Sequence, residues 1–343
     1  MRRLIAGRKK WVIAGAALLL IAGLVPLAWV KRTEILAWYY VQRLASADEA
    51  HRAAWIDDLL ALGEPAVPRL IACLAGHDPK ACANARAALL QGIAQADESQ
   101  RVRLARQLAE SFCTCSTSGQ PVVLALQTAI VERGDREVEQ VISVAVSTLT
   151  SAQHSRDKEV LAEALCLART LVTKTREPDV RAACRELVRL CIRSDHPENR
   201  ADALQLALHP DVHLLQEVLV LLDDPSPEVR RMTVVALGPS EQAIGTEDLL
   251  RWLHDPDPEM RLLCQSALRG RNLSENQIRL GRTLTDPRAS VRLQTVDALR
   301  RSPDLEPGVW LRRLSHDPEP AVRGAAIRAA AEHPFVHFAD RLE

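Results

Sequence analysis

Asp224-Pro225-Ser226-Pro227-Glu228-Val229-Arg230 is the first of four similar phrases in the last third of this chain. The others are Asp255-Pro256-Asp257-Pro258-Glu259-Met260-Arg261, Asp286-Pro287-Arg288-Ala289-Ser290-Val291-Arg292 and Asp317-Pro318-Glu319-Pro320-Ala321-Val322-Arg323. Each phrase begins 31 residues after the one before it. A fixed period in the range of about 20 to 50 residues is the signature of a stacked-repeat architecture. The sequence therefore predicts an all-α fold, an α-solenoid built from helical hairpins.

Apolar and small residues recur at fixed positions around each phrase. One apolar column precedes it, another stands directly before the Arg, and small residues follow the Arg at positions +3 and +6, with mostly Leu at +7. Positions −1, +3, +6 and +7 lie on one face of an α-helix. Each unit is therefore predicted to be a helix A, a short Asp-Pro turn and a helix B. The columns are Val218, Leu249, Leu280 and Leu311; Val229, Met260, Val291 and Val322; Thr233, Cys264, Thr295 and Ala326; Ala236, Ala267, Ala298 and Ala329; and Leu237, Leu268, Leu299 and Ala330.

The turn residues suit the start of a helix. An Asp side chain accepts hydrogen bonds from free backbone N–H groups there, and Pro fits the first turn because it has no N–H to lose. Ser274-Glu275-Asn276-Gln277 has the spacing of a capping box, which predicts the start of another helix A.

The repeated units resemble HEAT repeats, in the short bacterial form that includes the phycobilin-lyase HEAT-like repeats. The resemblance is specific over residues 210–343. It implies that an Asp and an Arg six residues apart in each unit form a structural ladder that bonds between successive repeats. The predicted ladder residues are Asp224 and Arg230, Asp255 and Arg261, Asp286 and Arg292, and Asp317 and Arg323.

Upstream of residue 210 the signature fades, and residues 51–209 are interpreted as degenerate HEAT-like repeats. The segment Gly63-Glu64-Pro65-Ala66-Val67-Pro68-Arg69-Leu70-Ile71 resembles a HEAT helix A, and residues 79–90 resemble a helix B. Asp78 and Arg86 are eight residues apart, however, so a ladder pair is not expected there.

The N-terminal region predicts a membrane anchor. Residues 1–10 are a basic tail, residues 11–30 contain no charge and are long enough to span a bilayer as a single helix, and residues 31–50 are a stem. The excess of positive charge before the apolar run places the N-terminus inside and the repeats outside, in the periplasm, with the anchor in the inner membrane. A cleaved signal peptide is the competing interpretation, with Ala45-Ser46-Ala47 as a cleavage pattern that lies far downstream.

The eight cysteines allow two interpretations. Most are expected to be small buried hydrophobes, while a disulfide from Cys113 or Cys115 back to Cys82, about one repeat away, is geometrically conceivable. Cys73 and His77 near these residues do not match a zinc spacing, so no metal site is predicted. The full set is Cys73, Cys82, Cys113, Cys115, Cys166, Cys184, Cys191 and Cys264.

Neither composition nor motifs point to catalysis. Lys plus Arg equals Asp plus Glu at 44 each, so no net field recruits nucleic acid. The chain has no phosphate-binding Gly-rich loop, no G-x-S-x-G and no H-E-x-x-H, and we predict neither an enzyme nor a cofactor. Two alternatives stay open: a lyase-type HEAT-like enzyme, and a nucleic-acid binder that uses arginines between residues 269 and 313.

The predicted function is a scaffold that presents a curved helical surface to protein partners. Exposed positions of helix B are the candidate contacts, and the adjacent leucines among them cannot both face the core. The candidate partner contacts are Arg231, Leu262, Leu263, Gln294, Asp297 and Arg328.

Overall fold

The computed structural model describes residues 32–134, 138–301 and 307–332. In these ranges the regular structure is helical, and no strand is present. The described chain forms two compact units. The first runs to Ser194 and includes His209–Val212, and the second contains Asp195–Leu208 and the chain from His213 onward.

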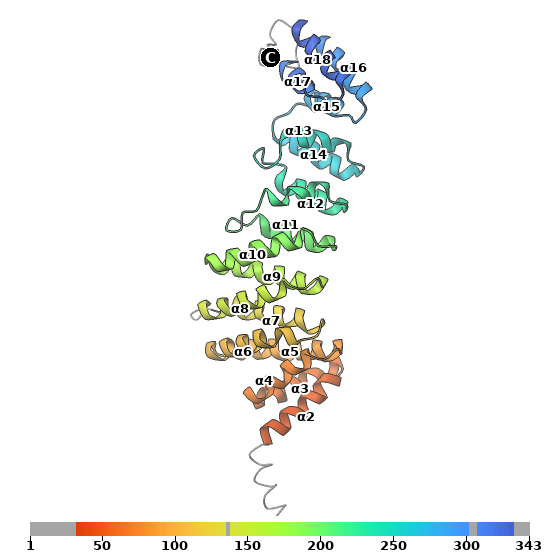
Figure 1. Ribbon diagram of the computed structural model, residues 1–343. Helices are drawn as coiled ribbons and strands as arrows, with labels where there is room; N and C mark the ends of the chain where they lie inside the picture. The colour runs from red at the N-terminus through yellow and green to blue at the C-terminus, as the bar shows by residue number, and fades with distance from the viewer. Residues whose placement is uncertain (1–31, 135–137, 302–306, 333–343) are drawn as a thin grey trace, which may run out of the picture. The chain divides into compact units, whose positions relative to one another are not determined.

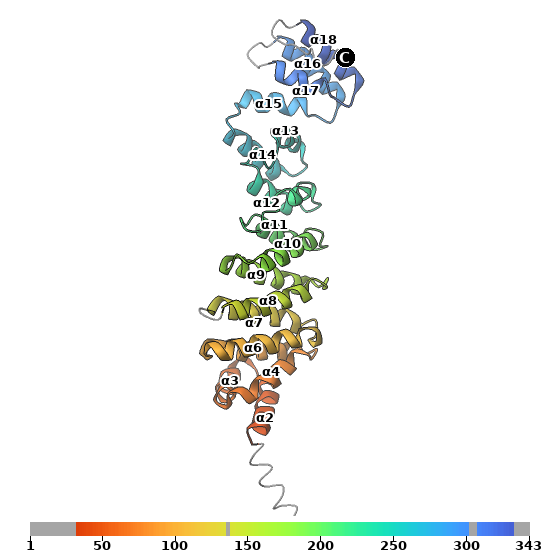
Figure 2. The same cartoon turned by 60° about the vertical axis from the view of Figure 1, so that its left-hand side comes forward.

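The first unit is a double layer of helical hairpins. The helices α4, α6, α8 and α10 pack one on the next in one layer, and α5, α7 and α9 do so in the other (Figures 1 and 2). Contacts between α4 and α5, α6 and α7, and α8 and α9 join the layers. The bounds are α2 (Arg32–Ser46), α3 (Glu49–Leu62), η1 (Glu64–Ala66), α4 (Val67–Leu74), α5 (Pro79–Gln95), α6 (Glu98–Ser111), η2 (Phe112–Thr114), α7 (Gly119–Arg133), α8 (Val138–Ala152), α9 (Lys158–Lys174) and α10 (Pro178–Cys191).

Buried side-chain amides tie neighbouring helices together in the first unit. Asn84 of α5 donates its Nδ2 to the carbonyl oxygens of Leu44 and Ala47 at the end of α2, at 2.8 and 3.1 Å. Gln127 of α7 donates its Nε2 to the carbonyl of Ala105 in α6, at 2.8 Å. Because a buried polar group without a partner is costly, these bonds fix which helix lies against which.

In the second unit, the helices repeat with the same 31-residue period as the sequence. Its B helices begin at Pro227, Pro258, Ala289 and Pro320, which are 31 residues apart. The predicted hairpin repeat is therefore confirmed over this part of the chain. The bounds are α11 (Pro197–Ala207), η3 (Glu217–Asp223), α12 (Pro227–Leu237), α13 (Thr246–Arg251), η4 (Trp252–His254), α14 (Pro258–Gly270), α15 (Glu275–Leu284), α16 (Ala289–Arg301), α17 (Pro307–Leu314) and α18 (Pro320–Glu332).

The core of the second unit follows most of the predicted columns. The column of helix A is buried in all four repeats, and so are the small residues at +3 and the residues at +7. The predicted burial of the Ala at +6 is wrong for two repeats, since Ala236 and Ala298 are exposed. The reason is geometric: −1, +3 and +7 form a row of i, i+4 neighbours, and +6 lies at the edge of that face.

The predicted location in the inner membrane is corrected. In the described ranges, from residue 32 to residue 332 with their gaps, no helix combines the length and the apolar character needed to cross a bilayer. This finding contradicts the predicted localisation. The predicted span itself, residues 11–30, lies outside the described residues.

Candidate functional site

The Asp of each phrase closes the turn that precedes helix B. Its Oδ1 accepts the backbone N–H two residues further on, at 2.8 Å from Ser226 and Asp257 and 2.9 Å from Arg288 and Glu319. This short-range bond is the usual reason for Asp in a turn. The Asp therefore stands two residues before the helix-capping position that the sequence predicted for it.

The Arg of each phrase closes the same turn from the other side. Its Nη1 donates to the carbonyl oxygen of its own phrase's Asp, six residues back. The four distances, for Arg230, Arg261, Arg292 and Arg323, are 2.7, 2.8, 2.6 and 2.7 Å. All eight predicted ladder residues thus belong to four equivalent turns.

Two of these arginines also reach the next repeat. Arg230 donates its Nε and Nη2 to the carboxylate of Asp255, both at 2.9 Å, and Arg292 does the same to Asp317, at 2.7 and 2.9 Å. We call each such bidentate pair a rung. The rung joins the Arg of one repeat to the Asp of the following one, whereas the Asp and Arg of a single phrase meet through the backbone.

The side chains that form the rungs are almost inaccessible to solvent. The side chains of Arg292 and Asp317 are 11% and 5% exposed. Burial favours the neutral form of Asp317, but hydrogen bonds from Arg292 and from the N–H of Glu319 outweigh it, so the net pKa of Asp317 is lowered. The bond to Asp317 likewise raises the pKa of Arg292. Charge-assisted bidentate bonds of this kind are the strong class of hydrogen bond.

The rung between the second and third phrases is missing, although both partners are described. Arg261 donates its Nη1 to the carbonyls of Asp255 and Pro256, at 2.8 and 3.0 Å, and no bond joins it to Asp286. The Asp286 carboxylate is held by Arg288, with Nε and Nη2 each at 3.0 Å. The hydrogen bond from Arg288 lowers the pKa of Asp286 to about 2.

One rung lies outside the predicted set. Arg200 of α11 donates its Nε and Nη2 to the carboxylate of Asp224, at 2.6 and 2.7 Å, and both side chains are buried. The signal for this rung is present in the sequence: Pro197-Glu198-Asn199-Arg200 has the Pro-Glu-x-Arg of the first two phrases and stands 30 residues before Pro227-Glu228-Val229-Arg230. This phrase lacks the Asp-Pro with which the four similar phrases begin, so it was not recognised as a further copy of them.

The six candidate partner contacts all lie on B helices, but not all are free. Leu262, Gln294, Asp297 and Arg328 are exposed, while Leu263 is half-buried. Arg231 forms ion pairs with Glu259 and, at 3.5 Å, with Asp257 of the next repeat. Of the two adjacent leucines, Leu262 is therefore the one that faces solvent.

Each B helix of the second unit exposes one large apolar side chain. These are Val235, Leu262, Leu293 and Ile327, with exposed fractions of 59%, 62%, 37% and 42%. Relative to the Arg of the phrase they occupy +5, +1, +1 and +4, which lie on one side of a helix because residues three and four apart are neighbours. We call these four residues the apolar ridge.

Several arginines considered for nucleic-acid binding are engaged within the protein. Arg269 pairs with Glu275, Arg271 donates to the carbonyls of Gly238 and Ser240, and Arg313 pairs with Glu247 at 3.4 Å. Such guanidinium groups are held by protein acceptors and do not form an open basic stripe.

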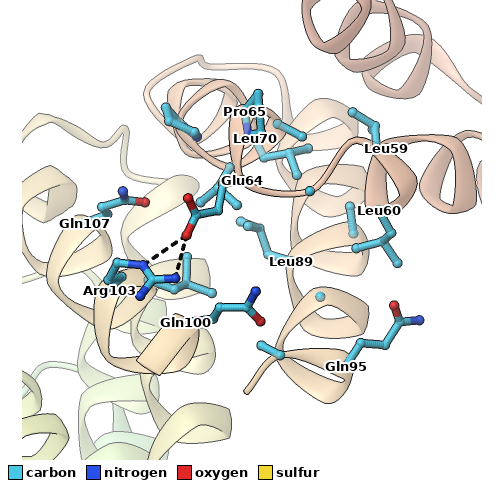
Figure 3. A pocket seen from close by; sticks show the side chains of 18 residues that line it. Leu59, Leu60, Glu64, Pro65, Leu70, Leu89, Gln95, Gln100, Arg103 and Gln107 are labelled. Atoms are coloured by element: carbon cyan, nitrogen blue, oxygen red, sulfur yellow. Dashed lines mark hydrogen bonds and ion pairs between the residues drawn. The ribbon is translucent and has the colours of Figure 1, made fainter. Parts of the chain in front are cut away.

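The first unit contains a cavity of about 580 Å³ that no motif of the sequence predicts. It lies between α3, η1, α4, α5 and α6, and Figure 3 shows its apolar floor, which includes Leu59, Leu70 and Leu89. Arg103 of α6 bonds to Glu64 of η1 at the rim, at 2.6 and 3.0 Å, so the two charges neutralise each other (Figure 3). No periodic pattern marks this cavity, because it is made by the packing of five separate elements.

In the part of the chain that the structure describes, no three His, Cys, Asp or Glu side chains come together in a way that could hold a metal ion. The neighbourhood of Cys73, His77 and Cys82 is included in that part.

Stacked hairpins and the 31-residue spacing of the B helices make this chain a helical repeat protein. No family model and no curated protein matches it. Among solved structures it is similar to an engineered protein from a structural genomics consortium, with 17% identity, a TM-score of 0.34 and coverage of 77% of this chain and 94% of that chain. It is also similar to a designed armadillo repeat protein, with 15% identity, a TM-score of 0.24 and coverage of 77% and 98%.

Proposed function

We propose that this chain is a HEAT-like repeat scaffold that binds other proteins through the solvent side of its B helices. In this proposal it acts by binding and not by catalysis. The predicted contacts are on the same helices as the apolar ridge, and one of them, Leu262, is a member of it; they are Arg231, Leu262, Leu263, Gln294, Asp297 and Arg328.

The apolar ridge is the observation that carries the proposal. Single exposed apolar residues are common on protein surfaces and need no explanation. Here, however, an exposed Val, Leu or Ile occurs on α12, α14, α16 and α18 alike, within one sector of each helix. A repeat protein that presents the same kind of side chain on successive helices offers an extended apolar contact to a partner.

The cavity of the first unit fits the same function. Its floor is apolar, and the charged pair at its rim, Glu64 and Arg103, is internally neutralised. A recess of this composition suits an uncharged, apolar side chain of a bound protein segment.

The test compares two substitutions of equally exposed residues. Leu262→Asp removes the most exposed member of the apolar ridge, and Val220→Asp changes a residue that is 63% exposed in η3, outside the B helices. Each full-length variant, purified and immobilised, is cross-linked to proteins from an extract of the source cells, and the retained proteins are compared with those of the wild type.

We expect a defined protein to be retained by the wild type and by Val220→Asp, and to be lost with Leu262→Asp. Both variants should keep the wild-type melting temperature, because neither residue is part of the core. Equal retention by all three proteins would show that the ridge does not form the interface.

A further inference from the structure

Cysteines from separate elements meet at the turn between α4 and α5. Cys73 is in the last turn of α4 and Cys82 is in the first turns of α5, where its thiol lies 3.6 Å from the carbonyl oxygen of Cys73 and 3.7 Å from that of Gly76. Cys82 is buried. Its thiol therefore points back into the turn and away from solvent.

Cys115 is brought to the same turn by the residue that follows it. Ser116 donates its backbone N–H and its hydroxyl to the carbonyl of Leu74, both at 3.0 Å, and its hydroxyl also lies 2.6 Å from the carbonyl oxygen of Gly76. The thiol of Cys82 and the hydroxyl of Ser116 thus approach one carbonyl group, that of Gly76.

The segment after η2 cannot move far from this turn. Gly119, at the start of α7, lies so close to the backbone of Leu74 that a Cβ at this position would overlap its carbonyl group. Glycine is required because only a residue without a side chain permits this approach. The chain from Cys115 to Gly119 is therefore fixed against the end of α4.

The Cys115 thiol also has a partner of its own beside this turn, since it lies 4.0 Å from the hydroxyl of Ser111. Burial raises the pKa of Cys115, the hydrogen bond with Ser111 lowers it in part, and the thiols of Cys82 and Cys113 add to the rise. Cys115 is buried and Cys113 is exposed. Cys82 of α5 and Cys115 after η2 are thus both buried beside the turn between α4 and α5, next to the exposed Cys113.

We propose that Cys82 and Cys115 form an oxidisable pair, which a peroxide converts into a disulfide between α5 and the segment that leads into α7. The thiolate of one cysteine attacks a peroxide oxygen, the O–O bond breaks, and a sulfenic acid and one water form. The second thiol attacks the sulfenic sulfur, the S–O bond breaks, and the disulfide and a second water form. Two thiols and one hydrogen peroxide thus give one disulfide and two waters.

The pair joins elements that belong to successive hairpins. A bond between Cys82 and Cys115 closes a loop that contains most of α5, all of α6 and η2. Such a cross-link restricts the unfolded chain and stabilises the fold. The oxidised protein should therefore melt at a higher temperature than the reduced one.

Peptide mapping tests the pairing directly. The full-length folded protein is treated with hydrogen peroxide, free thiols are blocked, and the protein is digested with trypsin without reduction. Residues 81–86 carry Cys82, residues 70–80 carry Cys73, and residues 107–133 carry both Cys113 and Cys115. We expect a cross-linked species of residues 81–86 with 107–133, which disappears on reduction.

Single substitutions decide which cysteine is bonded. Cys115→Ser should abolish the cross-link and the rise in melting temperature, while Cys113→Ser, on the same peptide, should keep both. Circular dichroism of each reduced variant shows whether the helices are intact. The proposal is overturned by a bond between residues 70–80 and 81–86, by a bond that survives Cys115→Ser, or by no bond in the folded wild type.

Discussion

Arg230 illustrates how a single side chain serves two repeats. Its Nη1 closes its own turn at the carbonyl of Asp224, while its Nε and Nη2 hold the carboxylate of Asp255 in the next repeat. Only a planar guanidinium with several fixed donors can make both sets of bonds at once, so Lys would not substitute for Arg here. The side chains of the pair are 12% and 6% exposed, and the rung is therefore screened little by solvent.

We predict that Arg230→Ala destabilises the second unit by about 3 kcal/mol, since removing one partner of a buried ion pair leaves the other charge uncompensated. Arg231→Ala is the matched control. Arg231 stands next in the chain and pairs with Glu259 at the surface, where such a pair contributes roughly 0.2–1 kcal/mol. Urea unfolding of both variants measures the difference, and equal losses would mean that the rung does not stabilise the fold.

A second prediction concerns pH. The hydrogen bond from Arg288 lowers the pKa of Asp286 from 3.8 to about 2. A carboxyl group whose pKa is lower in the folded state stabilises the fold above its unfolded pKa and loses this contribution as the pH falls. The stability difference between wild type and Asp286→Asn should therefore be constant above about pH 5 and shrink as the pH falls from 4 towards 2.

The measurement is the urea midpoint of both proteins at a series of pH values. A difference that stays the same from pH 6 to pH 2 would show that Asp286 does not titrate with a lowered pKa.

At the residue scale the sequence predicts much of this geometry and misses its exceptions. The positions of Asp and Arg at a fixed spacing predict four equivalent turns. Whether a given Arg reaches the next Asp depends on competitors nearby, and Arg288 is such a competitor for Asp286. The rung from Arg200 was missed for the opposite reason, because its phrase retains the Arg and has lost the leading Asp-Pro.

At the element scale, rungs and helix packing coincide. Rungs accompany the contacts of α11 with α12, α12 with α14, and α16 with α18. Between α14 and α16, where the rung is missing, these described helices have no direct packing of similar extent and are linked through α15. The sequence explains why this rung is missing. The residue two positions after the Asp is Arg288 in the third phrase, whereas the other phrases have Ser226, Asp257 and Glu319 there.

We predict that Arg288→Ser stabilises the second unit by about 1 kcal/mol, because it frees Asp286 to accept the charge-assisted bonds of Arg261. The double variant Arg288→Ser with Arg261→Ala isolates this effect. If the new rung forms, the gain disappears when Arg261 is absent, and the coupling appears in a double-mutant cycle. A gain that is equal with and without Arg261 would show that the stabilisation has another cause.

The sequence predicted the B helices more closely than the A elements. The B helices begin with Pro or Ala after a fixed turn, whereas the A elements of the second unit include the 3₁₀ segments η3 and η4. An apolar column specifies burial but not the type of helix, which is why this detail did not follow from the pattern. The cavity of the first unit could not be predicted from the sequence either, because it depends on how five elements pack.

At the scale of the whole molecule, each repeat contacts mainly its neighbours. In such a protein the stability is a sum of local terms and of interfaces between adjacent repeats, so a defect stays local. A globular protein with a single core would respond as one cooperative unit. The rungs should therefore act only between successive repeats.

Hydrogen–deuterium exchange with mass spectrometry, applied to the full-length wild type and to Arg230→Ala, shows whether the loss of one rung affects only the repeats beside it. We predict faster exchange in α11 to α14, which flank the lost rung, and unchanged exchange in α4 to α6 of the first unit. A uniform increase in exchange across all of these helices would contradict the account.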